Sequence, residues 1–161
     1  MFQIRNEVLL TASIFKKMNK LSILIPVFNE GNTIHLILDK IKNVTLPLNI
    51  SKEIIIINDC STDKTSENIK SYILKNQELS ILLLEHDKNK GKGAALHYGI
   101  YKASGDYLII QDADLEYDPE EYNILLKPVL DGYADVVYGS RFIGGKPHRI
   151  LFFWHTVGNK F

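Results

Sequence analysis

Four short apolar runs in this chain each end in a cluster of polar residues, and this repeated order constrains the fold more than any other feature. The runs cover residues 21–25, 54–57, 79–84 and 107–110. Segments of helical periodicity lie between them, a pattern typical of an α/β chain with a parallel sheet. In such a sheet the ligand crevice lies outside the carboxyl ends of the strands. The four polar clusters are therefore expected to converge on one site.

Apolar periodicity and capping residues predict the elements in more detail. The expected strands are 21–27, 53–58, 79–85, 106–111 and 135–139, and the expected helices are 30–43, 62–76, 91–104 and 118–131. Ser61 or Thr62 is expected to cap the second helix, and Asp118 before Pro119 the fourth. The predicted fold class is α/β, a mainly parallel, Rossmann-like open sheet with helices on both faces.

The composition excludes several classes of protein. The 161 residues, 45% of them hydrophobic, suit about one domain with a real core. Basic and acidic residues both number 19, so no overall field points to nucleic acid. The single cysteine, Cys60, excludes an internal disulfide and fits a reducing compartment. No apolar run approaches the roughly 18 residues that span a bilayer.

Asp112 and Asp114 flank one alanine directly after the apolar run 107–110. Hard carboxylate oxygens at this spacing suit Mg²⁺ or Mn²⁺, which would bridge the oxygens of a diphosphate, and Glu116 follows as a third candidate ligand. Such a cation would stabilise charge on a departing diphosphate. The alternative interpretation is a solvated or capping pair of carboxylates.

The other clusters supply complementary groups. Asp59 can accept hydrogen bonds from a ribose or a base, and Glu30 has the same potential, although each also suits a turn or a helix cap. The turn 89–93 opens a helix with small residues, so it allows close approach of an anion, and Lys92 adds charge; a flexible basic turn is the alternative. Arg141 suits phosphate because its guanidinium donates in pairs, unless it is an ordinary surface arginine.

Two further patterns bear on function. The five histidines show no spacing typical of a zinc site, and no serine sits in a Gly-x-Ser-x-Gly turn. Residues 149–154 combine an arginine with large apolar and aromatic residues. This segment is interpreted either as an interfacial anchor at a membrane surface or as the first turns of a core helix.

Taken together, these motifs resemble those of the family-2 inverting glycosyltransferases of GT-A fold, most closely the branch of dolichyl-phosphate mannose synthases and bacterial polyprenyl-phosphate sugar transferases. The resemblance covers residues 21–161, with the motifs in the family's order. They are Ile25–Glu30, Asn58–Thr65, Asn89–Gly93, Asp112–Glu116 and Gly139–Phe142.

The resemblance implies a role for each matching residue. The implied nucleotide contacts are Pro26, Phe28, Glu30, Asp59, Lys92 and Asp112. The implied metal ligands are Asp112, Asp114 and Glu116, and the implied catalytic set is Asp112, Asp114 and Arg141. In domain terms, residues 1–20 are a leader of unknown role, 21–145 the nucleotide-sugar-binding domain, and 146–161 the start of a truncated acceptor-side or interfacial helix.

Two departures from the family's pattern stand out. Asn58 and Cys60 replace the first acid and the glycine of the usual Asp-Asp-Gly-Ser motif. Members of this branch also continue beyond the position of Phe161 into acceptor-side helices, so the chain resembles the donor-binding half of such an enzyme.

The expected function is metal-dependent transfer of a hexose, with inversion, from a UDP- or GDP-sugar to a polyprenyl phosphate at the cytoplasmic face of a membrane. A phosphate acceptor is already ionised near neutral pH, so the site needs charge neutralisation and alignment more than a general base. The alternatives are a nucleotide-sugar-binding fragment without turnover and a transferase acting on a saccharide hydroxyl. A sugar-phosphate nucleotidyltransferase fits less well, because residues 26–30 are neither glycine-rich nor basic.

Overall fold

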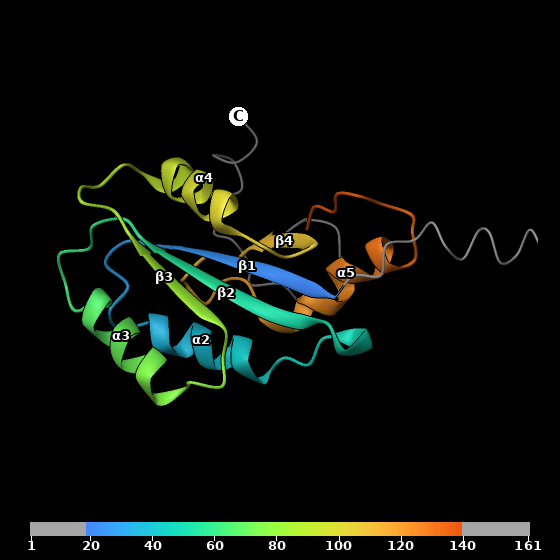
Figure 1. Ribbon diagram of the computed structural model, residues 1–161, viewed down its shortest axis with the longest axis horizontal. Helices are drawn as coiled ribbons and strands as arrows, with labels where there is room; N and C mark the ends of the chain where they lie inside the picture. Colours follow the sequence, from blue (N-terminus) through green and yellow to red (C-terminus); the bar gives the residue numbers. More distant parts are fainter. Residues whose placement is uncertain (1–18, 140–161) are drawn as a thin grey trace, which may run out of the picture.

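The fold is seen in a computed structural model of the chain, which describes residues 19–139 (Figure 1). Arg141, most of the expected leader and the expected 146–161 segment lie outside the described residues. The assignments made for them stay predictions.

One parallel sheet forms the centre of the fold. Its strands are β1 (Lys20–Val27), β2 (Ser51–Asn58), β3 (Ile81–Glu85) and β4 (Tyr107–Ile110), in the order β3-β2-β1-β4. The chain steps outward from β1 to β3 and then crosses to pair β4 with the other side of β1. This reversal between β1 and β4 is the point at which open α/β sheets place their ligand crevice. The predicted α/β fold is confirmed.

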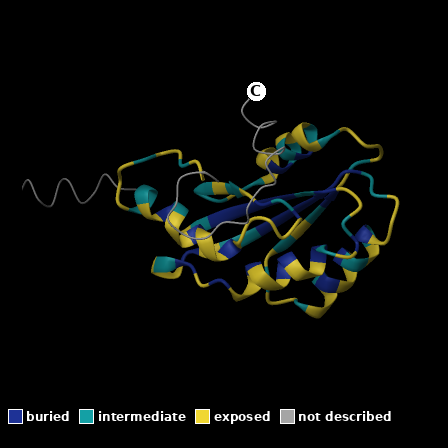
Figure 2. Cartoon of the chain, turned by 180° about the vertical axis from the view of Figure 1, so that it is seen from behind, coloured by how far each residue is buried: buried dark blue, intermediate teal, exposed yellow. Residues whose placement is uncertain are grey.

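Helices cover both faces of the sheet. The helices α2 (Ile34–Asn43), α3 (Thr65–Lys75) and α5 (Tyr122–Leu130) lie on one face, and α4 (Lys92–Lys102) lies on the other (Figure 1). Two short 3₁₀ turns, Pro47–Asn49 and Pro119–Glu121, precede β2 and α5. The central strands β1 and β2 are largely buried, whereas the edge strands β3 and β4 and the outer surfaces of the helices carry exposed residues (Figure 2).

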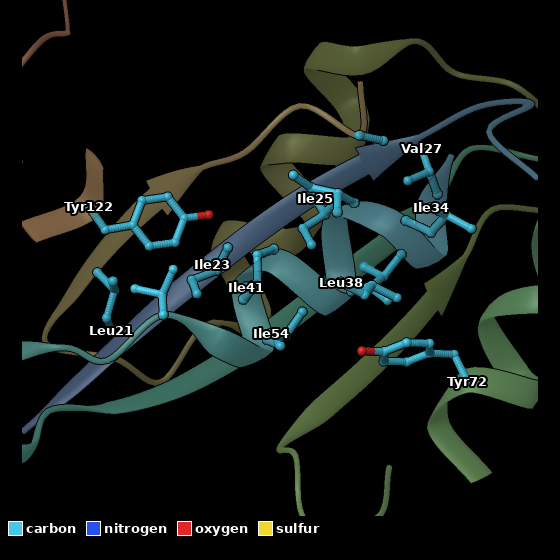
Figure 3. Close-up of a cluster of buried hydrophobic side chains, with 14 of the residues drawn as sticks. Leu21, Ile23, Ile25, Val27, Ile34, Leu38, Ile41, Ile54, Tyr72 and Tyr122 are labelled. Carbon is cyan, nitrogen blue, oxygen red and sulfur yellow. The ribbon is translucent and has the colours of Figure 1, made fainter. Parts of the chain in front are cut away.

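The larger core lies under α2, α3 and α5. Alternate residues of β1, from Leu21 to Val27, point to this face, as the period of a strand requires. They meet the apolar stripe of α2 together with Tyr72 from α3 and Tyr122 from α5 (Figure 3). The stripe recurs every three or four residues, at Ile34, Ile37, Leu38 and Ile41.

The smaller core lies under α4, which packs unusually close to the sheet. Leu24, Ile55 and Ile57 point to this face and contact α4. A Cβ atom at Gly99 would lie 2.8 Å from the Ile57 side chain and 3.3 Å from that of Leu24. Glycine at this position therefore sets how near α4 lies to β1 and β2.

The predicted boundaries need three corrections. The strand expected at 135–139 is wrong, because none of these residues pairs with a described strand, and Val136 and Tyr138 are 66% and 89% exposed. A strand needs a neighbouring strand to accept and donate its backbone hydrogen bonds, and an apolar composition alone does not provide one. The helix expected from 30 begins only at Ile34, after a turn. Neither Ser61 nor Thr62 caps α3, which starts at Thr65.

Candidate functional site

The strands separate at the carboxyl edge of the sheet, between β1 and β4. β4 pairs with β1 only from Leu21 to Leu24, and one further hydrogen bond joins Gln111 N–H to Leu24 O at 2.9 Å. Pro26 then follows on the same side of β1, where none of the strands described between residues 19 and 139 pairs with it. Proline lacks an N–H, so it is tolerated here without loss of a ladder bond. The pairing of β1 with β4 therefore ends near the edge where the sequence predicts a ligand.

The loops after β1 and β2 are joined to each other. Asn29 N–H donates to Ser61 Oγ at 2.9 Å, and Thr62 N–H donates to Asn29 Oδ1 at 2.8 Å. Asn29 and Cys60 both adopt left-handed backbone conformations, with φ of 58° and 61°. Ser61 and Thr62 are thus used to hold this pair of loops, which explains why they do not cap α3.

A second set of contacts fixes the start of the turn before α2. Asp63 accepts hydrogen bonds from Gly31 N–H at 3.0 Å and from Thr65 N–H at 2.9 Å. The pKa of Asp63 is lowered mainly by the hydrogen bond from the Thr65 hydroxyl, which outweighs the opposing effect of burial. Glu30 N–H donates to the Thr65 hydroxyl at 2.9 Å, and the Glu30 carboxylate accepts from Thr33. Glu30 therefore has a structural partner in addition to its predicted role.

Asp59 lies directly after β2 and is 4% exposed. Its Oδ1 accepts from Lys90 N–H at 2.9 Å and lies 2.7 Å from His86 Nδ1, while its Oδ2 accepts from Gly91 N–H at 2.7 Å. Burial alone would raise the pKa of this carboxyl, but these hydrogen bonds outweigh burial, so the pKa lies below its ordinary value. Asp59 is therefore an ionised carboxylate that anchors the turn predicted to approach an anion.

That turn leads into α4 and to a second carboxylate. Gly91, with φ of 84°, is the residue before α4, a conformation that glycine adopts without strain. Lys92 begins the helix, and its Nζ lies 2.5 Å from Asp112 Oδ1. The Lys92 side chain is 57% exposed and that of Asp112 28%. Two residues that the sequence assigns to one site are thus brought into contact from α4 and the end of β4.

Buried polar side chains support the loop after β4. Gln111 is 2% exposed and its amide donates to Asp112 O at 3.1 Å and to Tyr117 O at 3.2 Å. The Tyr122 hydroxyl donates to Gln111 Oε1 at 2.7 Å. Burial and the nearby Asp118 carboxylate raise the Tyr122 pKa, so the hydroxyl keeps its proton. The backbone of the acidic loop is therefore held from α5.

The donor set for a cation is open rather than closed. Asp114 and Glu116 are exposed, and Glu116 N–H donates to Asp114 Oδ1 at 3.1 Å. Among the described residues, no three His, Cys, Asp or Glu side chains gather closely enough to hold a metal ion. Mg²⁺ is commonly held by one or two carboxylates together with substrate phosphates. The carboxylates of Asp112 and Asp114 are ligands of the type that suits a cation shared in this way with phosphates.

The structure thus unites part of the predicted site. Asp59, Lys92 and Asp112 form one connected group through the 90–92 turn. Pro26 lines the same edge, and Phe28, 46% exposed, follows β1. Sequence reasoning missed His86, Gln111 and Tyr122. Gln111 carried a usable signal, because a single polar residue ends an otherwise apolar strand.

The fold is similar to that of several solved structures. The mannosyltransferase PcManGT from Pyrobaculum calidifontis, in complex with GDP-Man and Mn²⁺, superimposes with a TM-score of 0.57 at 26% identity, covering 62% of this chain and 28% of that chain. Glucosyl-3-phosphoglycerate synthase from Mycobacterium tuberculosis, in complex with Mn²⁺ and UDP, gives a TM-score of 0.55 at 23% identity, covering 70% and 39%. The domain therefore has the GT-A fold of glycosyltransferases.

Sequence comparison narrows the class to a family. Residues 22–151 match Glycosyl transferase family 2, and the chain belongs to this family. It is 34% identical over 139 residues to the dolichol-phosphate mannosyltransferase of Pyrococcus furiosus, covering 83% of this chain and 37% of that protein. It is also 34% identical over 127 residues to the undecaprenyl-phosphate 4-deoxy-4-formamido-L-arabinose transferase of Photorhabdus laumondii, covering 79% and 38%.

The chain spans less than two fifths of the length of these two relatives, 37% and 38%. Between residues 19 and 139, none of the helices combines the length and apolar character that crossing a bilayer requires.

Proposed function

We propose that this chain is the donor-binding part of an inverting glycosyltransferase that moves a hexose from a nucleotide-diphosphate sugar to a polyprenyl phosphate. The observation that carries the proposal is the connected group at the carboxyl edge, in which Asp59 anchors the turn of Lys92 and Lys92 contacts Asp112. Relatives named for transfer to dolichol phosphate and undecaprenyl phosphate support this choice of acceptor.

The residues divide the donor between them. Asp59, Glu30, Pro26 and Phe28 lie on the side of β1 and β2, and carboxylates there accept hydrogen bonds from a nucleoside rather than from phosphate. Lys92 supplies positive charge at the first turn of α4, where the helix dipole also favours an anion. In this proposal the nucleoside lies toward β2 and the diphosphate toward β4.

Asp112 and Asp114, with Glu116 as the third candidate, would hold Mg²⁺ or Mn²⁺. When bound, the cation would stabilise the negative charge of the departing diphosphate. Lys92, which contacts Asp112, would bring its ammonium group to a phosphate oxygen of the donor. Arg141 would add a paired donor to a phosphate.

The acceptor side follows from the chemistry of the nucleophile. A polyprenyl phosphate is ionised near neutral pH, so alignment and charge neutralisation can replace a general base. Residues 146–161 would begin the acceptor-side or interfacial helix, and the enzyme would work at the cytoplasmic face of the membrane. A saccharide hydroxyl would instead need a base to take its proton.

A nucleotide-sugar-binding fragment without turnover is the second candidate. Its basis is the connected group of Asp59, Lys92 and Asp112, which by itself accounts for binding of a donor. Both candidates predict the same donor site, and they differ only in whether the sugar leaves the nucleotide.

Calorimetric titration of UDP-glucose and GDP-mannose, with and without Mn²⁺, tests the donor site. We expect Mn²⁺-dependent binding of one donor that is lost in Asp114→Ala and kept in Asp131→Ala, an exposed carboxylate at the end of α5. Release of nucleotide diphosphate in the presence of undecaprenyl-phosphate vesicles then separates the transferase from the binding fragment. Binding of neither donor would refute the proposed function.

A further inference from the structure

His86 is a buried histidine with two side-chain contacts at the edge of the site. It follows β3 directly, and its N–H donates to Asn58 O at 3.0 Å, which extends the strand pairing by one residue. Its side chain is 6% exposed. The ring stacks on Tyr98 of α4, with centroids 5.5 Å apart and planes 11° apart. The ring is therefore fixed between the end of β3 and α4.

The ring nitrogen next to Asp59 is a hydrogen-bond donor. His86 Nδ1 lies 2.7 Å from Asp59 Oδ1, and the Asp59 side chain is 5% exposed. An ionised carboxylate only accepts, so Nδ1 carries the proton of this hydrogen bond. A charge-assisted bond between two buried groups holds both side chains in one orientation.

The other donors to Asp59 are less firmly supported. Lys90 and Gly91 N–H belong to the exposed turn before α4, and that turn is itself anchored by Asp59. His86, in contrast, is fixed by strand pairing and by Tyr98. Of the three donors, His86 is therefore the one whose position does not depend on Asp59.

The hydrogen bonds also define which acceptor site of the Asp59 carboxylate is not used within the protein. Two of the three donors reach Oδ1 and one reaches Oδ2. A carboxylate has about four acceptor sites, so the remaining one is on Oδ2. A negative acceptor suits an N–H or O–H of a nucleoside and repels a diphosphate.

We propose that His86 is a positioning residue for the donor nucleoside: it holds Asp59 so that the free acceptor site of Oδ2 is presented to the base or ribose. This inference rests on the proposed donor site. It assigns His86 to recognition of the nucleoside and leaves the diphosphate to Lys92 and the cation.

Calorimetry with matched ligands and variants tests this assignment. The ligands are UDP and GDP with Mn²⁺, and pyrophosphate with Mn²⁺ as a probe that lacks the nucleoside. His86→Phe keeps an aromatic ring against Tyr98 and removes the donor, whereas His86→Asn keeps a donor within reach of Asp59. His97→Ala, an exposed histidine of α4, is the control.

We expect His86→Phe to weaken binding of the recognised nucleoside diphosphate about tenfold, the effect of one lost hydrogen bond to a charged group. Pyrophosphate binding stays unchanged, His86→Asn recovers most of the affinity, and His97→Ala behaves as the wild type. In the free protein, the Gly91 amide exchanges its hydrogen faster in His86→Phe than in the wild type.

Three results would overturn the inference while leaving the donor site intact. They are wild-type nucleotide affinity in His86→Phe, an equal loss of affinity for pyrophosphate, and no recovery in His86→Asn. A wild-type protein that binds neither UDP nor GDP would refute the proposed function itself, and the inference with it. Thermal unfolding of each variant confirms that the comparisons are made between folded proteins.

Discussion

Strand β2 carries a hydrogen-bonded carboxylate near each end, and the two differ in what they connect. Glu53, near the start, accepts from the Ser22 hydroxyl at 2.6 Å and from Ser104 N–H at 2.9 Å. Asp59, after the end, accepts from His86 and from the 90–91 turn. Burial acts to raise both pKa values, but the hydrogen bonds outweigh it, so the pKa of each carboxyl group lies below its ordinary value. Titration behaviour alone does not separate them.

The contacts beyond each carboxylate do separate them. At the amino end, Ser22 Oγ accepts from Gly105 N–H at 2.8 Å, and Ser104 Oγ accepts from Lys20 Nζ at 3.2 Å, so the network returns to β1 and to the turn between α4 and β4. At the carboxyl end, the network continues through Gly91 to the exposed ammonium of Lys92 and to Asp112. The amino-end network is closed in the sense that, of the described elements, it joins only β1, β2 and that turn, whereas the carboxyl-end network is open in the sense that it leads to Lys92 and Asp112 at the candidate site.

Acid should disrupt both ends together, and this is the largest effect we expect. The unfolded pKa values are about 3.9 for Asp and 4.3 for Glu, and the folded values of Glu53 and Asp59 are lower. Their contribution to stability is therefore complete above the unfolded values and is lost as pH falls through the folded ones. Urea unfolding between pH 7 and pH 3 should show this fall, with a shallower slope in Glu53→Gln. Constant stability down to pH 3 would contradict it.

Glu53→Ala should break the amino end alone. It leaves the hydroxyl of Ser22, which is buried, without its acceptor, and we expect a loss of about 2–3 kcal/mol in the free energy of unfolding. The affinity for Mn²⁺ and nucleoside diphosphate should not change. Glu120→Ala, an exposed carboxylate of the turn before α5, is the control and should be close to wild type in both measurements. A parallel loss of nucleotide affinity in Glu53→Ala would show that the two ends are coupled.

Gln111→Leu should affect the carboxyl end, because Gln111 holds the backbone of the loop after β4. The substitution leaves Asp112 O and Tyr117 O without the amide donor, and we expect about 1–2 kcal/mol of lost stability together with weaker Mn²⁺ binding. Tyr122→Phe removes only the hydroxyl and keeps both bonds to the loop, so its effect should be smaller. Denaturant unfolding and Mn²⁺ titration by electron paramagnetic resonance measure the two effects. Equal losses in the two variants would contradict a role for Gln111 in holding the loop.

Cys60→Gly should give the smallest effect, and a favourable one. Cys60 has φ of 61°, a conformation that costs roughly 1–2 kcal/mol for a residue with a Cβ atom. Glycine removes this strain, but part of the gain is offset because glycine makes the unfolded chain more flexible. We expect a net gain of about 0.5–1 kcal/mol in thermal or urea unfolding. Cys60→Ala keeps the Cβ atom and should bring no gain; if it stabilises as much as glycine, backbone strain is not the cause.

Much of the fold could be predicted because its signals are local. The apolar runs predicted β1 to β4 to within about two residues at most ends, and Asp118 at a helix start is confirmed by its contact with Glu120 N–H. The strand expected at 135–139 failed for the opposite reason, because pairing depends on a neighbour that no local pattern specifies.

The candidate site shows the same division. Asp59 and Asp112 were identifiable because each is a charged residue just after an apolar run, and Lys92 because it lies in a glycine-containing turn that opens a helix. His86 was not, because its role depends on Asp59, 27 residues away, and on stacking with Tyr98. The position of Cys60 departs from the family's glycine, and its positive φ supplies the physical reason for that glycine.

The close approach at Gly99 has a mechanical consequence. Gly99 lies seven residues after Lys92, which is about 10 Å along the axis of α4. Because Gly99 and Lys92 lie on the same helix, a shift of α4 at the Gly99 contact also moves Lys92 at the first turn. A methyl group added at residue 99 would lie 2.8 Å from the Ile57 side chain, so either that side chain or α4 must shift, and any shift of α4 would change the position of Lys92 relative to Asp112.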